Sequence, residues 1–307
     1  MVDCTSPGSY IVVSPAKDEA AQIGQTLESM IRQTIRPLRW VIVDDGSRDG
    51  TSEIAEGYAK KYDWIRVHRL ESGAARKLGS GEIQAFAEGL GLAKDLKSDY
   101  IVKLDCDIEF PSDYFESLFS KFKNDDRLGI ASGQYCEKGA KGWAAVEMPP
   151  YHAAGASKVV RADCFHQIAG FPMSPGWDTA DEIKAQFRGW KTCHFTDIKF
   201  YHLRKEGSAS GSIRTNLLHG EVYYACGGGP SFFAFKTLHR MAMERPFFIG
   251  GLAMLWAYLS CHLMRKPRLV DHAEARFYRR TLNRRVRSLL TGGAKRRGAA
   301  RQDGLTT

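Results

Sequence analysis

Residues 101–110 read IVKLDCDIEF, an apolar run that ends in two aspartates separated by one cysteine. Side chains alternate along an extended chain, so Asp105 and Asp107 point to the same side of it. Two like charges on one side repel each other unless a cation lies between them. A hard divalent ion, which prefers oxygen ligands, suits such a pair at the end of a buried strand. The alternative is an ordinary surface turn.

The first 135 residues alternate between short β-branched runs and segments with helical periodicity. Strand-like runs occur at residues 10–14, 38–45, 64–70 and 100–105, and an amphipathic helical pattern follows each of the first three. This alternation predicts an α/β fold with a mainly parallel, twisted, Rossmann-like sheet and helices on both faces. Ligands of such sheets bind beyond the carboxyl ends of the strands.

Two further acidic clusters follow strands of this pattern. SPAKDEA (14–20) places Asp18 and Glu19 in the first turn of a helix, where the helix dipole alone favours acidic side chains. VDDGSRDGT (43–51) carries Asp44 and Asp45, one carboxylate more than a capped turn needs. A carboxylate at a strand end can hold a ribose hydroxyl or a base N–H. Both a turn and a ligand site therefore remain open for this second cluster.

Cysteine usage and charge bound the location and the partners. The seven cysteines are scattered without CxxC spacing, which favours a reducing compartment over a zinc site or a disulfide framework. The N-terminus lacks the basic and apolar pattern of a signal peptide, so we expect a cytoplasmic protein. The net charge is +9, but 13 of the 44 Lys and Arg and only three of the 35 Asp and Glu follow residue 264. This basic tail could meet anionic lipid, nucleic acid or neither.

The motifs, in this order, resemble those of family 2 glycosyltransferases of GT-A fold. Residues 11–51 are similar to the family's opening segment, which ends in VDDGS, and LDCDIEFPSDYF (104–115) is similar to its D-x-D segment. GASKVVRADCFHQIAGF (155–171) resembles its pre-acceptor segment, and WDTADEIKAQFRGWKT (177–192) resembles its acidic helix. The resemblance covers roughly residues 9–205, and the ordered set is more specific than any single motif.

The resemblance implies an enzyme that transfers a sugar from a nucleotide diphosphosugar with inversion, using Mn²⁺ or Mg²⁺. Asp107 would bind the metal and His202 could complete its shell, while Arg204 and Lys205 could neutralise the diphosphate. Arg161 could likewise contact a phosphate. Lys17 stands where the family often has a tyrosine that packs on the base. The nucleotide-binding residues would be Pro15, Ala16, Lys17, Glu19, Asp45 and Asp105.

Sugar transfer also needs a base that takes the proton of the acceptor hydroxyl. Asp181 and Glu182, in the first turn of the helix that carries an apolar stripe at 183, 187 and 190, are the candidates for this catalytic role. Asp178 is a rival, because this helix is shorter than the family's helix. The helix dipole would favour acidic residues here even without a catalytic role.

Residues 246–264, PFFIGGLAMLWAYLSCHLM, contain no Asp, Glu, Lys or Arg and are long enough to be a candidate span. A single crossing would separate the catalytic part from the basic tail, although both are expected inside the cell. We therefore expect an interfacial or re-entrant helix, with a buried core helix as the alternative. The expected domains are 1–230 for the transferase, 231–264 for the apolar helical segment and 265–307 for the basic tail.

Two functions from different classes follow. The first is a glycosyltransferase, peripheral or monotopic on the inner face of the cell membrane, that acts on a lipid-linked or glycan acceptor. The alternative is an α/β protein with a basic tail that binds nucleic acid or membrane without catalysis. That alternative leaves the acidic clusters unexplained, and a negative cleft repels phosphate, so nucleic acid is not expected as a partner.

Overall fold

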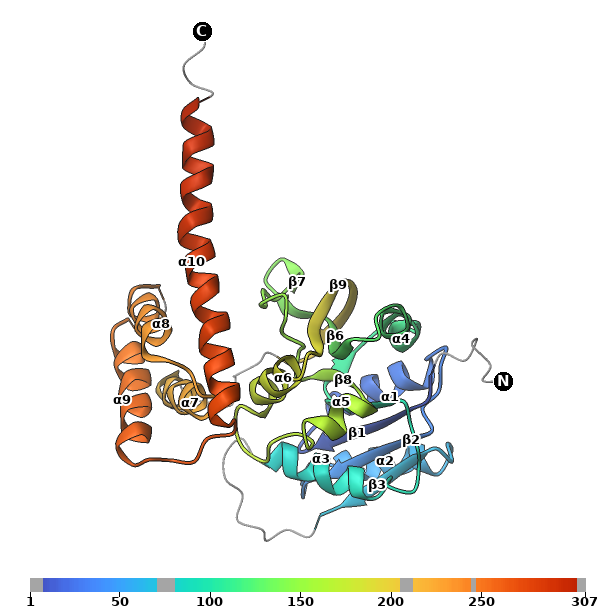
Figure 1. The fold of residues 1–307 in the computed structure, drawn as a ribbon. Helices are drawn as coiled ribbons and strands as arrows, with labels where there is room; N and C mark the ends of the chain where they lie inside the picture. The colour runs from blue at the N-terminus through green and yellow to red at the C-terminus, as the bar shows by residue number, and fades with distance from the viewer. Residues whose placement is uncertain (1–7, 71–80, 205–211, 244–246, 303–307) are drawn as a thin grey trace. The chain divides into compact units, whose positions relative to one another are not determined.

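The computed structural model describes residues 8–70, 81–204, 212–243 and 247–302 (Figure 1). The chain divides into two compact units, Met1–Ser208 and Ala209–Thr307. The sequence predicts a boundary after residue 230, whereas helix α7 (Ser212–Ala225) lies in the second unit with the later helices.

One sheet of nine strands runs through the described part of the first unit, in the order β3-β2-β1-β4-β8-β6-β9-β5, with β7 paired to β6. Strands β1 to β4 are parallel to one another, as the sequence predicts. Beyond β4 the sheet is mixed, because β8 is antiparallel to β4 and β6 while β6 and β9 are parallel. The strands are β1 Tyr10–Ala16, β2 Arg39–Asp44, β3 Ile65–Arg69, β4 Tyr100–Leu104, β5 Ile108–Glu109, β6 Leu128–Gly139, β7 Gly142–Ala145, β8 Ser157–Arg161 and β9 Lys191–His202.

Helices cover both faces of this sheet, as predicted. Alternation along β1 directs Tyr10 and Val12 into one apolar layer and Ile11 and Val13 into the other. The first layer includes side chains of α1 (Ile23–Ile31), α2 (Thr51–Ala59) and α4 (Tyr114–Asn124). The second includes side chains of α3 (Gly81–Gly91), α5 (Ala162–Gln167) and α6 (Trp177–Phe187). The sheet is therefore buried on both sides, and its strand ends are left to carry polar groups.

The second unit contains four helices in its described residues. Helix α7 approaches α9 closely, since a Cβ on Gly220 would lie 2.2 Å from the carbonyl oxygen of Met254. The small residues Gly250 and Ala257 of α9 are buried. None of the helices in the described ranges is long and apolar enough to cross a membrane. The remaining helices are α8 Pro230–Met243, α9 Ile249–Leu263 and α10 His272–Gln302.

Helix α3 packs on the sheet at a position that admits no side chain. A Cβ on Gly89 would lie 2.6 Å from Cγ1 of Val13 and 2.7 Å from Cγ2 of Val43. By contrast, a Cβ on Gly57 of α2 would meet no described atom within 4 Å beyond its own helix. Substitutions at these two glycines therefore distinguish the effect of helix propensity from the effect of packing on the sheet.

We expect Gly57→Ala to raise the free energy of unfolding by about 0.5–1 kcal/mol, because alanine loses less backbone entropy in a helix. Gly89→Ala gains the same propensity but overpacks the layer beneath α3, so it should lower the free energy of unfolding by about 1–2 kcal/mol. Urea titrations of both variants measure the difference. Equal midpoints for the two variants would contradict the packing of α3 on β1 and β2.

Candidate active site

The carboxyl ends of β1 and β2 bring four of the predicted nucleotide-binding residues together. Ala16 pairs with the end of β2, and its carbonyl oxygen accepts a 2.8 Å hydrogen bond from the backbone N–H of Asp45. The Lys17 ammonium group donates to the carbonyl oxygen of Asp45 at 3.2 Å. Pro15 lies in register with Val43 one step back along the same pair of strands. The two loops form one continuous edge of the sheet.

Asp44 accounts for the turn that follows β2. Its Oδ1 accepts hydrogen bonds from the backbone N–H of Ser47 at 2.8 Å and from the Ser47 hydroxyl at 2.5 Å. The hydroxyl of Thr51 accepts a 2.8 Å bond from the backbone N–H of Glu19, which ties the two loops together. Asp44 thus stabilises the turn through its side chain, and Asp45 is the additional carboxylate at this strand end.

Asp105, Asp107 and His202 lie close enough to share one ion, since one ligand atom from each falls within 4.8 Å of the others. The pairing of β5 with β9 sets this geometry, because Ile108 lies opposite His202 and the N–H of Leu203 donates to the carbonyl oxygen of Asp107 at 2.8 Å. Nε2 of His202 is 3.4 Å from Oδ1 of Asp107. Two carboxylates and an imidazole are a donor set that Mn²⁺ or Mg²⁺ can use.

Arg204 places a positive charge at the same point. Its guanidinium lies 2.6 Å from Oε1 of Glu19 and 3.1 Å from Oδ2 of Asp107. Burial and the Asp107 carboxylate raise the pKa of Glu19 to about 7, although Arg204 acts in the opposite direction. Within the described residues, the buried Oε2 of Glu19 has no hydrogen-bond partner. This cluster therefore carries both unbalanced negative charge and an acceptor atom that a ligand can satisfy.

Asp105 is held by a buried lysine of the same strand. The Lys103 ammonium group is 2.5 Å from Oδ1 of Asp105 and also contacts the carboxylate of Glu82. Burial raises the pKa of Asp105, and the Lys103 charge opposes that rise. The N–H of Asp105 donates to the carbonyl oxygen of Ala156 at 2.8 Å, which fixes its backbone against the segment before β8. Asp105 and Asp107 thus have different cationic partners.

A second buried lysine lies beside the first. Lys103 and Lys158 are directly opposite each other in the antiparallel pair β4–β8, and both are almost fully buried. The ring of Trp177, the first residue of α6, lies 5.4 Å from the Lys103 ammonium and 5.1 Å from the Lys158 ammonium. The face of an aromatic ring attracts a nearby cation, so the contact is favourable for both lysines. Trp177 therefore links the Asp105 cluster to helix α6.

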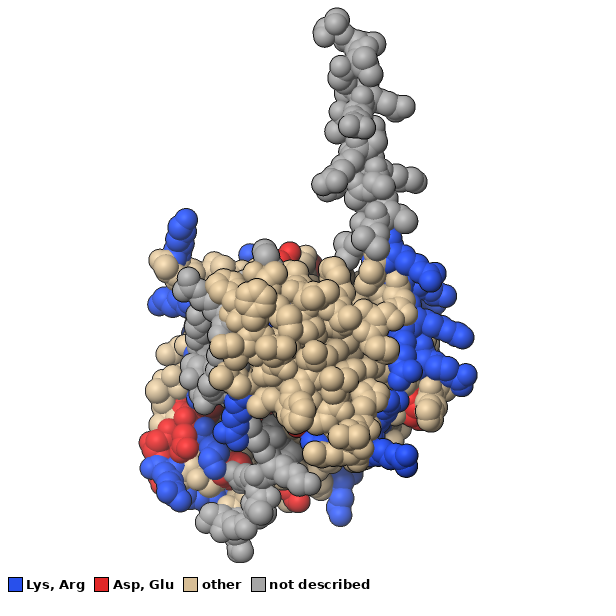
Figure 2. Space-filling model, turned by 90° about the vertical axis from the view of Figure 1, so that its left-hand side faces the viewer, with Lys and Arg blue, Asp and Glu red and all other residues tan. Residues whose placement is uncertain are grey.

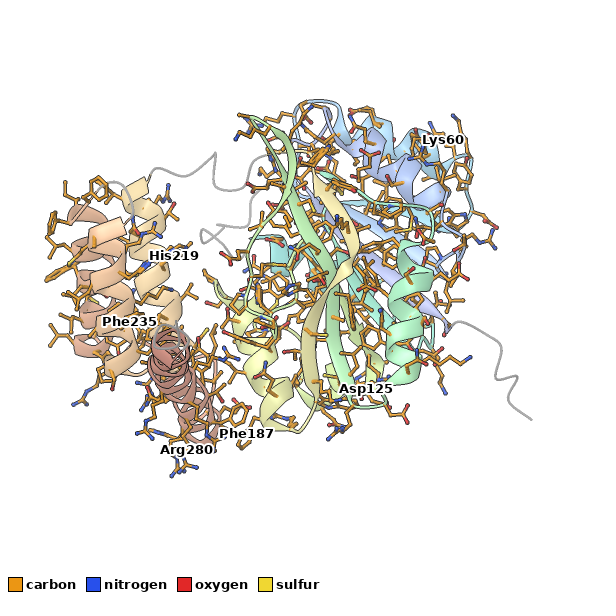
Figure 3. All side chains as sticks on the ribbon, turned by 90° about the horizontal axis from the view of Figure 1, so that it is seen from above. Lys60, Asp125, Phe187, His219, Phe235 and Arg280 are labelled. Atoms are coloured by element: carbon orange, nitrogen blue, oxygen red, sulfur yellow. The ribbon has the colours of Figure 1, made fainter. Side chains whose placement is uncertain are left out.

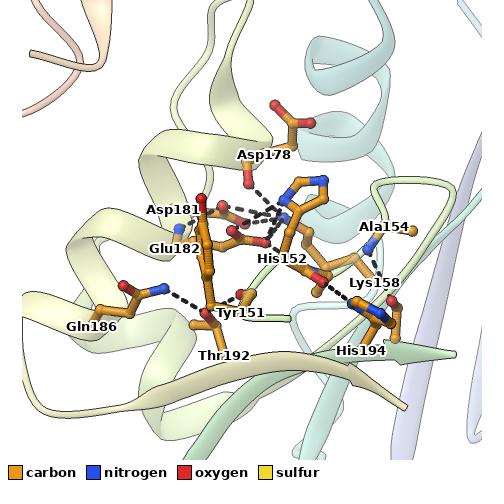
Figure 4. A network of polar contacts seen from close by, with 12 residues as sticks. Tyr151, His152, Ala154, Lys158, Asp178, Asp181, Glu182, Gln186, Thr192 and His194 are labelled. Carbon is orange, nitrogen blue, oxygen red and sulfur yellow. Dashed lines mark hydrogen bonds and ion pairs between the residues drawn. The ribbon is translucent and has the colours of Figure 1, made fainter. Parts of the chain in front are cut away.

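Lys158 forms ion pairs with Asp181 and Glu182, the two residues that the sequence predicts as the base (Figure 4). Its ammonium group contacts Oδ1 of Asp181 at 3.2 Å and Oδ2 at 2.9 Å, and lies 3.5 Å from Oε1 of Glu182. The Glu182 carboxylate also accepts a 2.7 Å bond from the N–H of Ala153 and lies 3.1 Å from Nδ1 of His152. Asp181 and Glu182 are both almost fully buried. With Lys158 they form a buried ion-pair network.

Asp178 differs from both, because its side chain is half-buried and points away from Lys158 (Figure 4). Lys158 contacts only its backbone carbonyl oxygen, at 2.9 Å. A Cβ on Gly155 would lie 3.9 Å from the Cβ of Asp178, and the next residue, Ala156, bonds the backbone of Asp105. Asp178 thus differs from Asp181 and Glu182, because Lys158 contacts its backbone and not its carboxylate.

The structure also shows which residues the sequence analysis missed or misplaced. Lys103 and Lys158 were not singled out, although a lysine inside an apolar strand (IVKLD and SKVVR) is a signal for a buried ion pair. Arg161 is not at the site, because its guanidinium donates to the carbonyl oxygens of Phe122 and Leu128 at the other end of β8. Lys205 lies outside the described residues.

Comparison with known proteins shows what the first unit is similar to. Residues 11–154 match the family model described as glycosyl transferase family 2. The chain is 31% identical over 118 residues to the cholesterol galactosyltransferase of Borreliella burgdorferi, a match that covers 36% of this chain and 29% of that protein. It is 35% identical over 118 residues to the succinoglycan biosynthesis protein ExoA of Rhizobium meliloti, with 38% and 33% covered. The chain thus spans about a third of the length of these relatives.

Solved structures agree on the fold. The mannosyltransferase PcManGT of Pyrobaculum calidifontis, in complex with GDP-Man and Mn²⁺, matches with a TM-score of 0.54 at 19% identity, over 86% of this chain and 89% of that one. GalNAc-T7 with UDP, GalNAc and Mn²⁺ matches with a TM-score of 0.57 at 17% identity, over 87% and 56%. At these identities the likeness shows the fold alone, and it confirms the predicted GT-A fold.

The Lys158–Asp181 pair gives a stability prediction. Lys158→Met leaves the buried Asp181 without its cation, so it should lower the free energy of unfolding by about 3–5 kcal/mol near pH 8. In the native protein, burial raises the pKa of Asp181 to about 7 from 3.8. The native state therefore binds this proton more tightly than the unfolded state does, and the free energy of unfolding falls as pH rises from about 4 to about 7. Removing Lys158 raises that pKa further. The loss measured by urea titration should therefore be smaller near pH 5.5.

The double variant Lys158→Met/Asp181→Leu serves as the control, because it replaces the ion pair with apolar side chains. It should recover much of the lost stability. A Lys158→Met variant as stable as the native protein at both pH values would contradict the buried ion pair.

Proposed function

Because residues 11–154 match the model of glycosyl transferase family 2, we propose that the chain is an inverting glycosyltransferase. It moves a sugar from a nucleotide diphosphosugar to a lipid-linked or glycan acceptor. The single observation that carries the proposal is the cluster of Asp105, Asp107 and His202 at the strand ends, next to the loops that hold Glu19 and Asp45. A sheet edge of this kind is where α/β domains bind nucleotides.

We propose that the nucleoside lies along the edge built by Pro15, Ala16, Lys17 and Asp45, with Asp105 on the ribose and diphosphate side. Glu19 supports this placement, since its buried Oε2 is an unsatisfied acceptor among the described residues. The stem of Lys17 is exposed and can cover the face of a base. Arg204 supplies a guanidinium whose two carboxylate partners can be exchanged for diphosphate oxygens.

A divalent metal fits the same cluster. The donor set is two carboxylates and one imidazole within 4.8 Å, and the Arg204 guanidinium already shows that the site attracts positive charge. Asp107 and His202 would hold Mn²⁺ or Mg²⁺, with Asp105 beside them. When bound, such an ion neutralises the charge of the departing diphosphate.

We propose Asp178 as the base that takes the acceptor proton, in place of Asp181 and Glu182. Both oxygens of Asp181 contact Lys158, and the Glu182 carboxylate contacts Lys158, His152 and the N–H of Ala153. A general base needs an oxygen within reach of the substrate hydroxyl. Asp178 offers one at the start of α6, beside the segment that anchors Asp105.

We further propose that the first compact unit carries the transfer and that the second unit, with its basic α10, brings the enzyme to the inner face of the cell membrane. The relatives named for cholesterol galactosylation and succinoglycan biosynthesis support a lipid or polysaccharide acceptor. The active site would then face the cytoplasm, which is where nucleotide sugars, the proposed donors, are found.

Calorimetric titration of UDP, GDP and dTDP, each with and without Mn²⁺, tests the donor and metal parts of the proposal. We expect one nucleotide to bind with an affinity that depends on Mn²⁺. Asp107→Asn should weaken that binding about tenfold or more, because it removes a metal ligand. Asp125→Asn, at the opposite end of the sheet, is the matched control and should bind like the native chain. If none of the three nucleotides binds, the result contradicts the proposed donor site and favours the alternative of a non-catalytic binding protein with a basic tail.

Steady-state kinetics with the donor so identified test the base. Asp178→Asn should lower kcat by about 10²–10⁴-fold, the usual contribution of a general base, and leave donor affinity unchanged. Asp181→Asn should instead lower stability, because it weakens the partner of Lys158. A kcat that falls for Asp181→Asn at native stability, and not for Asp178→Asn, would return the role to Asp181.

A further inference from the structure

Helix α9 exposes a continuous apolar stripe. Its exposed large side chains recur every three or four residues, which places them on one side of the helix. Trp256 is 69% exposed and Leu263 is 84% exposed. The opposite side of α9 is buried against the other helices of its unit through Gly250, Met254 and Ala257. The stripe consists of Ile249, Leu252, Trp256, Leu259 and Leu263.

Neighbouring segments of the second unit widen this stripe into a face. Phe235 and Leu238 of α8 are 54% and 66% exposed, and Phe248, just before α9, is 67% exposed. Figure 2 shows the result as a broad area without Lys, Arg, Asp or Glu. We call these residues, together with the α9 stripe, the apolar face. A soluble surface rarely exposes so many large apolar side chains together unless a partner covers them.

Positive charge borders the apolar face. Arg276, Arg280, Arg284 and Arg287 of α10 are exposed and spaced by four, four and three residues, so they form one stripe along that helix. In Figure 2 basic side chains run down one edge of the apolar area, and Figure 3 shows the Arg280 side chain extending outward from α10. Arg265 is exposed at the end of α9, next to Leu263 and Met264. Helices α8 and α9 contain no Asp or Glu.

This combination selects one kind of partner. A lipid bilayer offers apolar chains beneath a layer of headgroups, and anionic headgroups complement an arginine stripe beside an apolar face. A second copy of this chain complements it poorly, because each copy would bring another arginine stripe and no acidic side chain of α8 or α9. An exposed tryptophan also suits the headgroup region, where its ring is amphipathic.

We propose that the apolar face of α8 and α9 lies in the surface of an anionic bilayer, with the α10 arginines on the headgroups. This inference rests on the membrane part of the proposed function. Helix α9 would lie along the bilayer surface, with its other side packed on the protein. An acceptor carried by lipid would then be presented to the enzyme at the surface where the enzyme is bound.

Cosedimentation of the full chain with vesicles tests this proposal, using phosphatidylcholine alone and phosphatidylcholine mixed with phosphatidylglycerol. The native chain should bind the anionic vesicles more tightly. Leu252→Glu/Trp256→Glu should weaken binding at least about tenfold, because it places two charges in the apolar face. Arg280→Ser/Arg284→Ser should weaken binding to anionic vesicles about five-fold per arginine and reduce its sensitivity to salt.

Leu38→Glu/Leu92→Glu is the matched control, since these leucines are 45% and 48% exposed in the first unit. It should bind vesicles like the native chain. Nucleotide titration of all variants separates this proposal from the proposed function, because the α9 and α10 variants should keep native nucleotide binding. Equal vesicle binding by the native chain and the α9 variant overturns the proposal. The proposal is also overturned if the native chain binds no vesicles and forms a dimer without lipid, while the Leu252→Glu/Trp256→Glu variant is a monomer.

Discussion

The repulsion between carboxylates at the ends of β1 and β4 is the constraint on which the site depends. Glu19 and Asp107 share one guanidinium, that of Arg204, and Asp105 has its own cation in Lys103. In a partly buried setting such charges interact more strongly than they would in water. Each of these carboxylates therefore has a positive group beside it, Lys103 of β4 for Asp105 and Arg204, just after β9, for Glu19 and Asp107. A bound metal and a diphosphate would rearrange this balance of charge.

The same reasoning explains why two lysines stand in the middle of the sheet. Lys103 and Lys158 are cross-strand partners, and their ammonium groups contact different carboxylates, those of Asp105 and Asp181. The ring of Trp177 lies near both ammonium groups, so the start of α6 is attached to the centre of the sheet through aromatic and ionic contacts. A buried pair of this kind contributes modestly to net stability but is costly to break. Its effect here is to fix where the first turn of α6, including Asp178, lies.

The two units divide their chemistry in opposite ways. The first unit buries charged groups at its strand ends and keeps apolar side chains in two layers under helices. The second unit has a small aromatic core around Tyr223 and Tyr258 and leaves large apolar side chains of α8 and α9 outside it. The first pattern is that of a ligand site, and the second is that of a surface made for an apolar partner. The proposed transfer to a membrane-bound acceptor would use both.

The sequence alone determined the α/β alternation, the parallel order of the first four strands and the position of the acidic clusters, because period-two and period-3.6 patterns and strand ends are local features. It also indicated that residues 246–264 are apolar without deciding which side is buried. Only the tertiary structure decided that Asp44 caps a turn, that Asp181 and Glu182 belong to Lys158, and that Arg204 reaches Glu19 across 185 residues of chain. These pairings depend on which strands become neighbours: β8 beside β4 brings Lys158 to Lys103, and β9 beside β5 brings His202 to Asp107. Strand order beyond β4 is set by long-range packing, which no short stretch of sequence encodes.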